Sequence, residues 1–177
     1  MATATATGLK RWILDVPDFP KPGILFRDIT PLLRNGRQLH GVINRWARRY
    51  ARRRIDVVVG VEARGFLLAA ALADRLRAGL VPVRKRGKLP RRTTRAAYQL
   101  EYGADALEMH ADAIQPGDRV LVVDDVLATG GTMEAVTKLV TDLGGKIIEL
   151  TFLIELVPLK GRARLRSHPI HALIQYR

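Results

Sequence analysis

Apolar residues follow a helical period in one part of the chain and a strand-like run in the next, and these changes predict the secondary structure. Over residues 39–51 the apolar side chains recur every three or four positions with arginines on the other faces, which is typical of an amphipathic helix. The β-branched run 55–61 is typical of a parallel strand buried on both faces. We then expect a second helix over 64–77, stopped by Gly79, and a second strand over 80–83.

The second half of the chain continues the same alternation. The Pro-Gly-Asp turn at 116–118 leads into a strand over 119–124, and a helix with one apolar face follows and ends at the Gly-Gly pair 144–145. Two more strands are expected over 147–154 and 172–176. This alternation predicts an α/β domain with a mainly parallel central sheet that is flanked by helices.

Three segments show neither the helical nor the strand-like pattern of apolar residues. Residues 1–8 are small and polar, and we expect them to be disordered. Residues 15–22 hold three prolines, which predicts a loop or an extended arm because proline lacks an amide donor. Residues 84–105 are basic at first and then carry Gly, Pro and Thr, and we expect a long loop of the kind that acts as a lid.

The composition is that of a globular protein and excludes several chemistries. The 177 residues are 47% apolar and 27% charged, which suits a single soluble domain with a sizeable core. The absence of cysteine excludes a disulfide scaffold, a zinc ribbon, a thiol nucleophile and a thiol redox centre. No apolar run approaches the roughly 20 residues of a membrane span, and the first residues lack the features of a secretory signal. We therefore expect a cytoplasmic protein that does not bind membranes.

Positive charge is in clear excess and is unevenly distributed. Lysine and arginine number 30 against 17 acidic residues, and residues 1–95 hold 22 of the basic but only 6 of the acidic side chains. Such an excess favours an anionic partner, which could be nucleic acid, acidic lipid or a polyphosphate. In the other interpretation arginine simply fills solvated surface positions, and we therefore assign a function only to arginines inside motifs.

The stretch 120–132, VLVVDDVLATGGT, holds the most informative arrangement of polar residues. A buried strand ends in the adjacent carboxylates Asp124 and Asp125, and a turn of small residues then leads into a helix. Amides at such a helix N-terminus bind phosphate, whereas carboxylates beside a phosphate suit sugar hydroxyls, with or without a metal. The stretch therefore predicts a site for a ribose 5-phosphate. The glycine motifs of P-loop and dinucleotide-binding proteins are absent from the sequence.

This stretch also resembles the sugar-pyrophosphate motif of the type I phosphoribosyltransferase family. Further segments resemble the adenine phosphoribosyltransferases within that family, in order and at the expected spacing, from about residue 9 to the C-terminus. These segments are 17–31 (PDFPKPGILFRDITP), 62–66 (EARGF), 84–90 (RKRGKLP), 98–103 (YQLEYG) and 155–161 (ELVPLKG). The resemblance implies one type I phosphoribosyltransferase domain over 9–177, with a small N-terminal hood over 9–35 and a mobile lid over 88–105.

The resemblance implies the reaction adenine + 5-phosphoribosyl 1-pyrophosphate → AMP + pyrophosphate, a step of purine salvage. Mg²⁺ would be the cofactor, held by the substrate and by water near Asp124. The transition state would resemble an oxocarbenium ion, and a closed lid would exclude water from it. The partners would be these substrates and products and a second copy of the chain in a homodimer, with no nucleic acid.

Residue roles also follow from the resemblance. Asp124 and Asp125 would hold the ribose hydroxyls, and Glu101 on the lid would transfer a proton at the purine. The 5′-phosphate would be bound by Ala128, Thr129, Gly130, Gly131 and Thr132. The pyrophosphate would be bound by Arg64, Lys85, Arg86 and Lys88. Adenine would be bound by Leu25, Phe26 and Arg27, with Phe26 stacking on the base and backbone atoms near Arg27 reading its polar edge.

One segment departs from the family pattern, and two other functions remain open. The family usually has Asp-Ser-Arg-Gly-Phe where this chain has Glu-Ala-Arg-Gly-Phe at 62–66, so we expect different metal and pyrophosphate contacts at Glu62 and Ala63. One alternative is a regulator with this fold that senses the sugar pyrophosphate and binds nucleic acid through the basic half. The other is a transferase for a different purine base, such as hypoxanthine or guanine.

Overall fold

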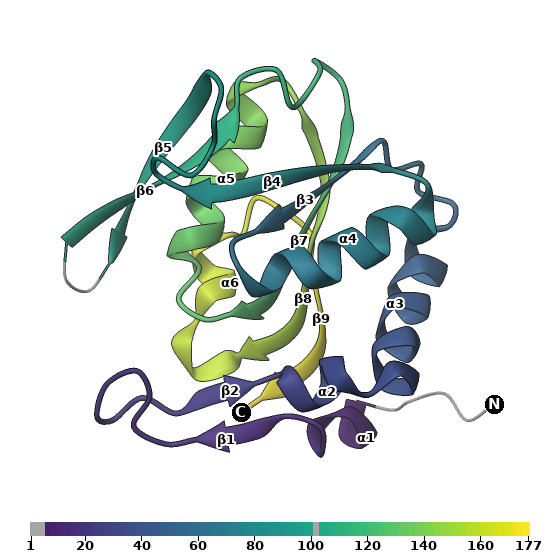
Figure 1. Cartoon of the computed structure of the whole chain (residues 1–177), viewed down its shortest axis with the longest axis vertical. Helices are drawn as coiled ribbons and strands as arrows, with labels where there is room; N and C mark the ends of the chain where they lie inside the picture. Colours follow the sequence, from purple (N-terminus) through teal and green to yellow (C-terminus); the bar gives the residue numbers. More distant parts are fainter. Residues whose placement is uncertain (1–5, 101–102) are drawn as a thin grey trace.

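The computed structural model describes residues 6–100 and 103–177. They form two sheets, a seven-stranded sheet flanked by helices and a separate two-stranded sheet (Figure 1). The strand order of the large sheet is β5-β6-β4-β3-β7-β8-β9. Its parallel strands are β3 (Val57–Val61), β4 (Gly79–Lys85), β7 (Arg119–Leu127), β8 (Lys146–Leu156) and β9 (Ile170–Tyr176). The predicted α/β class with a mainly parallel sheet is confirmed.

Helices cover both faces of the sheet and enclose two apolar cores. Val58 of β3 and Leu121 of β7 are buried in the core under α3 (Gly36–Tyr50) and α4 (Arg64–Leu76), whereas their neighbours Val59 and Val122 are buried in the core under α5 (Gly131–Asp142). Side chains alternate between the faces along a strand, so a run of β-branched residues is buried on both sides. The helices are α1 (Ala6–Lys10), α2 (Thr30–Arg34), α3 (Gly36–Tyr50), α4 (Arg64–Leu76), α5 (Gly131–Asp142) and α6 (Gly161–Arg164), with a 3-10 turn at Val157–Leu159.

The predicted helices form, with one difference at the end of α4. Helix α3 begins at Gly36, where the side chain of Asn35 accepts a hydrogen bond from the amide of Gln38 at 3.2 Å. We expected Gly79 to stop α4, but Arg77 has the positive φ of 56° that ends the helix, and Gly79 already begins β4. The residue with positive φ must directly follow the last helical turn, and Gly79 lies two positions beyond that point in the chain.

Within residues 6–100 and 103–177, no helix is long and apolar enough to cross a membrane.

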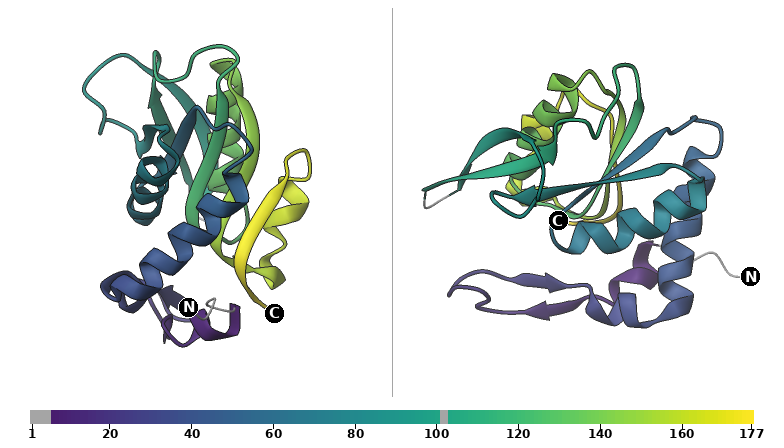
Figure 2. Two further views of the ribbon diagram at one scale, coloured as in Figure 1. Left: turned by 90° about the vertical axis from the view of Figure 1, so that its right-hand side faces the viewer. Right: turned by 45° about the horizontal axis from the view of Figure 1, so that its top comes forward.

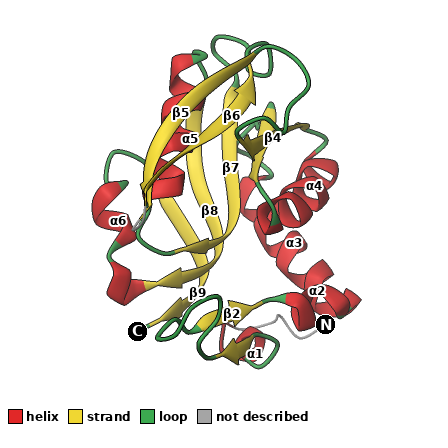
Figure 3. Ribbon diagram, turned by 60° about the vertical axis from the view of Figure 1, so that its left-hand side comes forward, coloured by secondary structure: helices red, strands yellow, loops and turns green. Residues whose placement is uncertain are grey.

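The segment expected to be a long loop is instead largely a β-hairpin. Strands β5 (Thr93–Leu100) and β6 (Gly103–His110) pair in antiparallel fashion, and β6 joins the large sheet beside the end of β4 (Figure 3). Ala96, Leu107 and Met109 are buried in the core that also contains residues of α5. The loop prediction was wrong because this burial depends on α5, which follows some 30 residues later and is invisible to local periodicity.

The segment expected to form the N-terminal hood contains a second hairpin, which lies across one end of the large sheet (Figures 1 and 2). Strands β1 (Leu14–Val16) and β2 (Phe26–Asp28) pair in antiparallel fashion, and the proline-rich segment mostly forms the arm between them. Helix α1 includes the last three residues of the segment 1–8 that we expected to be disordered, and residues 1–5 lie outside the described part of the chain.

Candidate functional site

Asp124 and Asp125 lie inside β7 rather than at its end, because the strand continues to Leu127. Strand β3 pairs with β7 only as far as Val123, so the edge of β7 beyond that residue is open towards the turn from β3 into α4. Asp125 is buried and Asp124 is partly buried. The two carboxylates thus lie at the carboxyl side of the parallel strands, where open α/β sheets bind their ligands.

Ionisation of either carboxylate costs free energy at this position because both are largely removed from water. Burial, and next the charge of Asp125, raise the pKa of Asp124 well above its usual value, although Asp125 donates its amide to Oδ1 of Asp124 at 2.8 Å. Burial also raises the pKa of Asp125, and the charge of Arg64 opposes this rise. Adjacent carboxylates with raised pKa values mark a site for a ligand that supplies hydrogen-bond donors or positive charge.

Gly65 allows the start of α4 to approach these carboxylates closely. A Cβ atom at this position would lie 2.7 Å from Oδ1 of Asp124 and 3.2 Å from the carbonyl oxygen of Val123. Any other residue would push α4 away from β7, so glycine is required here for packing. The sequence motif points to Arg64 as an anion ligand but does not reveal this packing role of Gly65.

Arg64, assigned to pyrophosphate, contacts groups from both the ribose and the base subsites. Its Nε lies 2.6 Å from Oδ2 of Asp125, and its guanidinium carbon lies 4.5 Å from the ring centre of Phe26. Its Nη1 donates to the carbonyl oxygen of Arg27 at 3.5 Å. Residues that the sequence assigned to pyrophosphate, ribose and base therefore meet at one point, although they come from α4, β7 and β2.

The segment 128–132 forms the turn between β7 and α5. Gly130 has a φ of 85° and precedes the first residue of the helix, Gly131. The amide of Glu134 donates to the carbonyl oxygen of Gly130 at 2.9 Å, so the three amides before it have no partner within the helix. Unpaired amides at the positive end of a helix dipole are the arrangement that the predicted phosphate site requires.

The segment 155–161 contains a second loop that packs against this turn. A Cβ atom on Gly130 would lie 2.9 Å from the carbonyl oxygen of Gly161, so the two loops are in close contact. Arg162 holds the second loop in place, because it donates to both oxygens of Glu155 at 2.6 and 2.8 Å and to the carbonyl oxygen of Ile170 at 3.1 Å. The segment 155–161 therefore serves the site by packing.

Phe26 lies on β2 next to the exposed side chain of Leu25. Phe26 is half-buried, and Leu25 is 45% exposed. The ring of Phe19, itself 51% exposed, meets Phe26 edge-on with 5.1 Å between the ring centres. Phe19 was not among the predicted site residues, although its place in the segment 17–31 is a signal that could have identified it.

Arg27 directs its side chain away from Phe26 and its carbonyl oxygen towards Arg64. Its guanidinium pairs with Asp15 of β1 and lies 4.0 Å from the ring centre of Tyr176 at the end of β9. These contacts tie the hood to the large sheet. A fixed carbonyl oxygen beside Phe26 is a hydrogen-bond acceptor for a ligand stacked on that ring.

The basic residues Lys85, Arg86 and Lys88 lie at the end of β4 and in the following turn. All three are exposed, and none forms a salt bridge with another described residue. The turn is fixed by the amide of Gly87, which donates to Glu108 at 3.0 Å. Glu62, the departure from the family pattern, accepts hydrogen bonds from Arg84 and from the backbone of Lys85. The cations thus remain available to an anionic ligand.

Glu101 lies outside the described residues, so its role stays a prediction. Within the described part of the chain, no group of three or more His, Cys, Asp or Glu side chains could hold a metal ion. A metal at this site would therefore need oxygen atoms from a ligand or from water.

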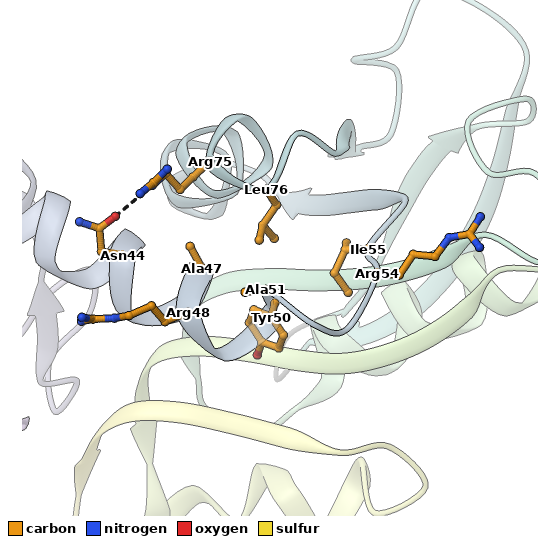
Figure 4. Close-up of a pocket in the computed structure, with 9 residues that line it drawn as sticks. All are labelled: Asn44, Ala47, Arg48, Tyr50, Ala51, Arg54, Ile55, Arg75 and Leu76. Carbon is orange, nitrogen blue, oxygen red and sulfur yellow. Dashed lines mark hydrogen bonds between the residues drawn. The ribbon is translucent and has the colours of Figure 1, made fainter.

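A groove of about 670 Å³ lies between α3 and α4, and none of the residues that line it belongs to the predicted site (Figure 4). Figure 4 shows Arg48 and Arg54 directed to opposite sides of the groove, and Arg75 donates to Oδ1 of Asn44 at 3.1 Å. Since these arginines do not converge, the groove is a weaker candidate than the site around Asp124.

The chain is similar in sequence and in fold to known phosphoribosyltransferases. Residues 33–170 match the family model "Phosphoribosyl transferase domain". The adenine phosphoribosyltransferase of Chloroflexus aurantiacus is 54% identical over 172 residues, which cover 97% of this chain and 99% of that protein. The crystal structure of the Rhodothermus marinus enzyme has a TM-score of 0.93 at 52% identity and covers 97% of this chain and 98% of that one.

A solved complex extends this comparison. The Saccharomyces cerevisiae adenine phosphoribosyltransferase, solved with an imino-altritol bisphosphate and adenine, has a TM-score of 0.90 at 41% identity, covering 95% of this chain and 97% of that one. The similarity thus extends over nearly the whole of each of these proteins and includes the segments that form the site. The chain belongs to the adenine phosphoribosyltransferase family.

Proposed function

We propose that the site around Asp124 and Asp125 transfers the phosphoribosyl group of 5-phosphoribosyl 1-pyrophosphate to adenine, forming AMP and pyrophosphate for purine salvage. The observation that carries this proposal is the meeting of Arg64, Phe26 and Asp125 at one point. A cation, an aromatic ring and buried carboxylates beside a phosphate-binding turn match the pyrophosphate, base, ribose and 5′-phosphate of the two substrates.

The sugar phosphate would be held by β7 and the turn that follows it. The amides of 128–132 and the hydroxyls of Thr129 and Thr132 would bind the 5′-phosphate at the start of α5. Asp124 and Asp125 would accept hydrogen bonds from the 2′- and 3′-hydroxyls. Their negative charge would also favour the positive charge that develops on the ribose as the bond to pyrophosphate breaks.

The leaving pyrophosphate would be neutralised by Arg64, Lys85, Arg86 and Lys88. Mg²⁺ fits beside these residues, because it is commonly held by one or two carboxylates together with substrate phosphates and water. Asp124 would adjoin it, and the lack of a three-ligand protein group among the described residues agrees with binding through the substrate. When bound, the ion would supply further neutralisation of the leaving group.

The base would stack on Phe26 beside Leu25, and its amino group would donate to the carbonyl oxygen of Arg27. Adenine fits this acceptor better than hypoxanthine, which carries a carbonyl oxygen at the corresponding position and would leave two acceptors facing each other. The complex of the yeast relative with adenine supports the same choice of base. A nucleic-acid-binding regulator is not favoured, because it would need neither an acceptor for a base nor a ring to stack on it.

Glu101 would transfer a proton at the imidazole part of the purine once the hairpin β5–β6 closes over the substrates. This assignment rests on the resemblance of the segment 98–103 alone. The base of the hairpin is anchored by buried Ala96 and Leu107.

We further expect a homodimer and a cytoplasmic location. Leu67 on the outer face of α4 is 55% exposed and Leu80 on β4 is 46% exposed. Strand β6 pairs with β4 only at Arg84 and Lys85, so Leu80 lies on a part of β4 that β6 does not cover. Exposed leucines and an open strand edge support an interface between two copies. Cell fractionation would test the location.

The direct test is a steady-state assay of the purified protein with 5-phosphoribosyl 1-pyrophosphate, Mg²⁺ and either adenine, hypoxanthine or guanine. We expect AMP from adenine, much slower reaction with the other bases, and loss of activity when a chelator removes the metal. Product from hypoxanthine or guanine at the rate of adenine would contradict the base assignment. No product from any base, together with salt-sensitive binding of nucleic acid, would favour the regulator.

A further inference from the structure

Arg64 fills the place that the base needs. Its guanidinium lies over the ring of Phe26, 4.5 Å from the centre, and its Nη1 donates to the carbonyl oxygen of Arg27 at 3.5 Å. The proposed function gives these two groups to adenine, one for stacking and the other for its amino group. The same side chain also holds Oδ2 of Asp125 at 2.6 Å, a carboxylate that the proposed function gives to ribose.

The chemistry of a guanidinium explains how it occupies a purine site. It is planar, it stacks on aromatic rings, and its edge carries N–H donors. Stacking on Phe26 and donation to a backbone carbonyl oxygen are also what an adenine ring and its amino group would do. The ion pair with Asp125, whose side chain is only 7% exposed, adds an electrostatic attraction that holds the guanidinium there.

We propose that Arg64 is a gate on the base site: without a pyrophosphate group it occupies the position of adenine, and a bound pyrophosphate draws it away. This inference rests on the proposed function, which assigns Phe26 to the base and Arg64 to the pyrophosphate. A polyphosphate anion competes with Asp125 for the guanidinium. When it succeeds, the ring of Phe26, the carbonyl oxygen of Arg27 and the carboxylate of Asp125 become free together.

The gate makes the two binding events cooperative. A ligand that binds only the open arrangement is weakened by the fraction of molecules in which that arrangement exists. Pyrophosphate therefore strengthens adenine binding, and by linkage adenine strengthens pyrophosphate binding by the same factor. If Arg64 were instead a fixed structural partner of Asp125, its removal would leave adenine binding unchanged or make it weaker.

The experiment measures the Kd of adenine by isothermal titration calorimetry, with and without magnesium pyrophosphate, for the wild type and Arg64→Met. We expect Arg64→Met to bind adenine alone about tenfold more tightly than the wild type, as for an open fraction of about a tenth. Magnesium pyrophosphate should tighten adenine binding to the wild type by a similar factor and should have no such effect on the variant. Arg75→Met, on the same helix but bonded to Asn44, is the matched control and should behave as the wild type.

Two further variants separate the possible failures. Arg64→Gln replaces Arg64→Met if that variant does not fold, as judged by circular dichroism. Phe26→Leu should weaken adenine binding, and if it does not, the proposed base site itself is wrong and the gate fails with it. If Phe26→Leu weakens adenine binding while Arg64→Met binds adenine no more tightly than the wild type, the gate is overturned and the base site stands.

Discussion

The carboxylate of Glu62 is bound to the guanidinium of Arg84, with 3.2 Å between Oε2 and Nε and 3.4 Å between Oε1 and Nη2. The amide of Lys85 adds a third hydrogen bond at 3.0 Å. Glu62 directly follows β3, and Arg84 and Lys85 end the neighbouring strand β4. The longer acid in the family's Asp position therefore joins two strand ends at the edge of the site.

This contact predicts that Glu62→Gln destabilises the protein without greatly changing its affinity for the sugar pyrophosphate. Burial acts to raise the pKa of Glu62, but the hydrogen bonds from Arg84 and Lys85 outweigh it and leave the pKa lowered. The charged pair should contribute about 1 kcal/mol, present above the usual pKa of glutamate and lost in acid. Chemical denaturation at pH 7 and at pH 3 measures this, with Glu134→Gln as a control at an exposed ion pair. A large rise in KM for the sugar pyrophosphate would instead give Glu62 a role in binding.

Replacing both carboxylates, by Asp124→Asn with Asp125→Asn, should remove turnover and leave the fold intact. The two side chains serve the ligand, and we expect kcat/KM to fall by roughly 10³-fold, since groups that stabilise charge in the transition state are lost. Steady-state kinetics measure the loss, and circular dichroism checks the fold. Unchanged kcat/KM would contradict the ribose assignment.

Asp124→Asn alone should stabilise the ligand-free protein at neutral pH. The pKa of Asp124 is raised in the folded state, so the folded protein binds this proton more tightly than the unfolded chain. Stability is therefore lost as the pH rises from the unfolded pKa through the folded one, and the ionised carboxylate is unfavourable above both. We expect a gain of about 1 kcal/mol for the variant at pH 7.

Below about pH 4 that gain should vanish, because Asp124 is then protonated in both states. Thermal unfolding of the wild type and of Asp124→Asn across pH 4 to 8 measures the difference. A variant that is less stable than the wild type at pH 7 would show that the carboxylate stabilises the ligand-free fold.

Glu101→Ala should lower kcat by roughly 10²-fold, within the range of a general acid–base group, while the affinity for the sugar pyrophosphate changes much less. Glu108→Ala is no control here, because Glu108 is buried and pairs with Arg95 at 2.6 Å. The suitable control is Asp112→Ala, an exposed carboxylate that pairs with Arg91 just beyond β6. Normal turnover of Glu101→Ala would remove the proton-transfer assignment.

The exposed leucine on α4 predicts the oligomeric state. Light scattering at micromolar concentration should give the mass of two chains, and Leu67→Glu should shift it towards one, because a charge buried in an apolar interface is unpaired. Leu14→Glu, at an equally exposed leucine on β1, should leave the mass unchanged. A wild-type mass near that of one chain would contradict the homodimer.

The local sequence by itself determined the elements whose pattern is regular over many residues. Helix α3 and strands β3 and β7 could be predicted because their burial follows a fixed period along the chain. The turn at 128–132 could be predicted because a helix N-terminus and a glycine with positive φ are local properties.

Only the tertiary structure decided the features that join distant segments. The hairpin β5–β6 is stabilised by the burial of Ala96 and Met109 beside α5, and no period in the segment itself reveals that partner. The contacts of Arg64 with Phe26 and Asp125 join residues 26, 64 and 125. Sequence motifs assign each of them a ligand, but the direction in which a long charged side chain lies depends on which partners the fold brings within its reach.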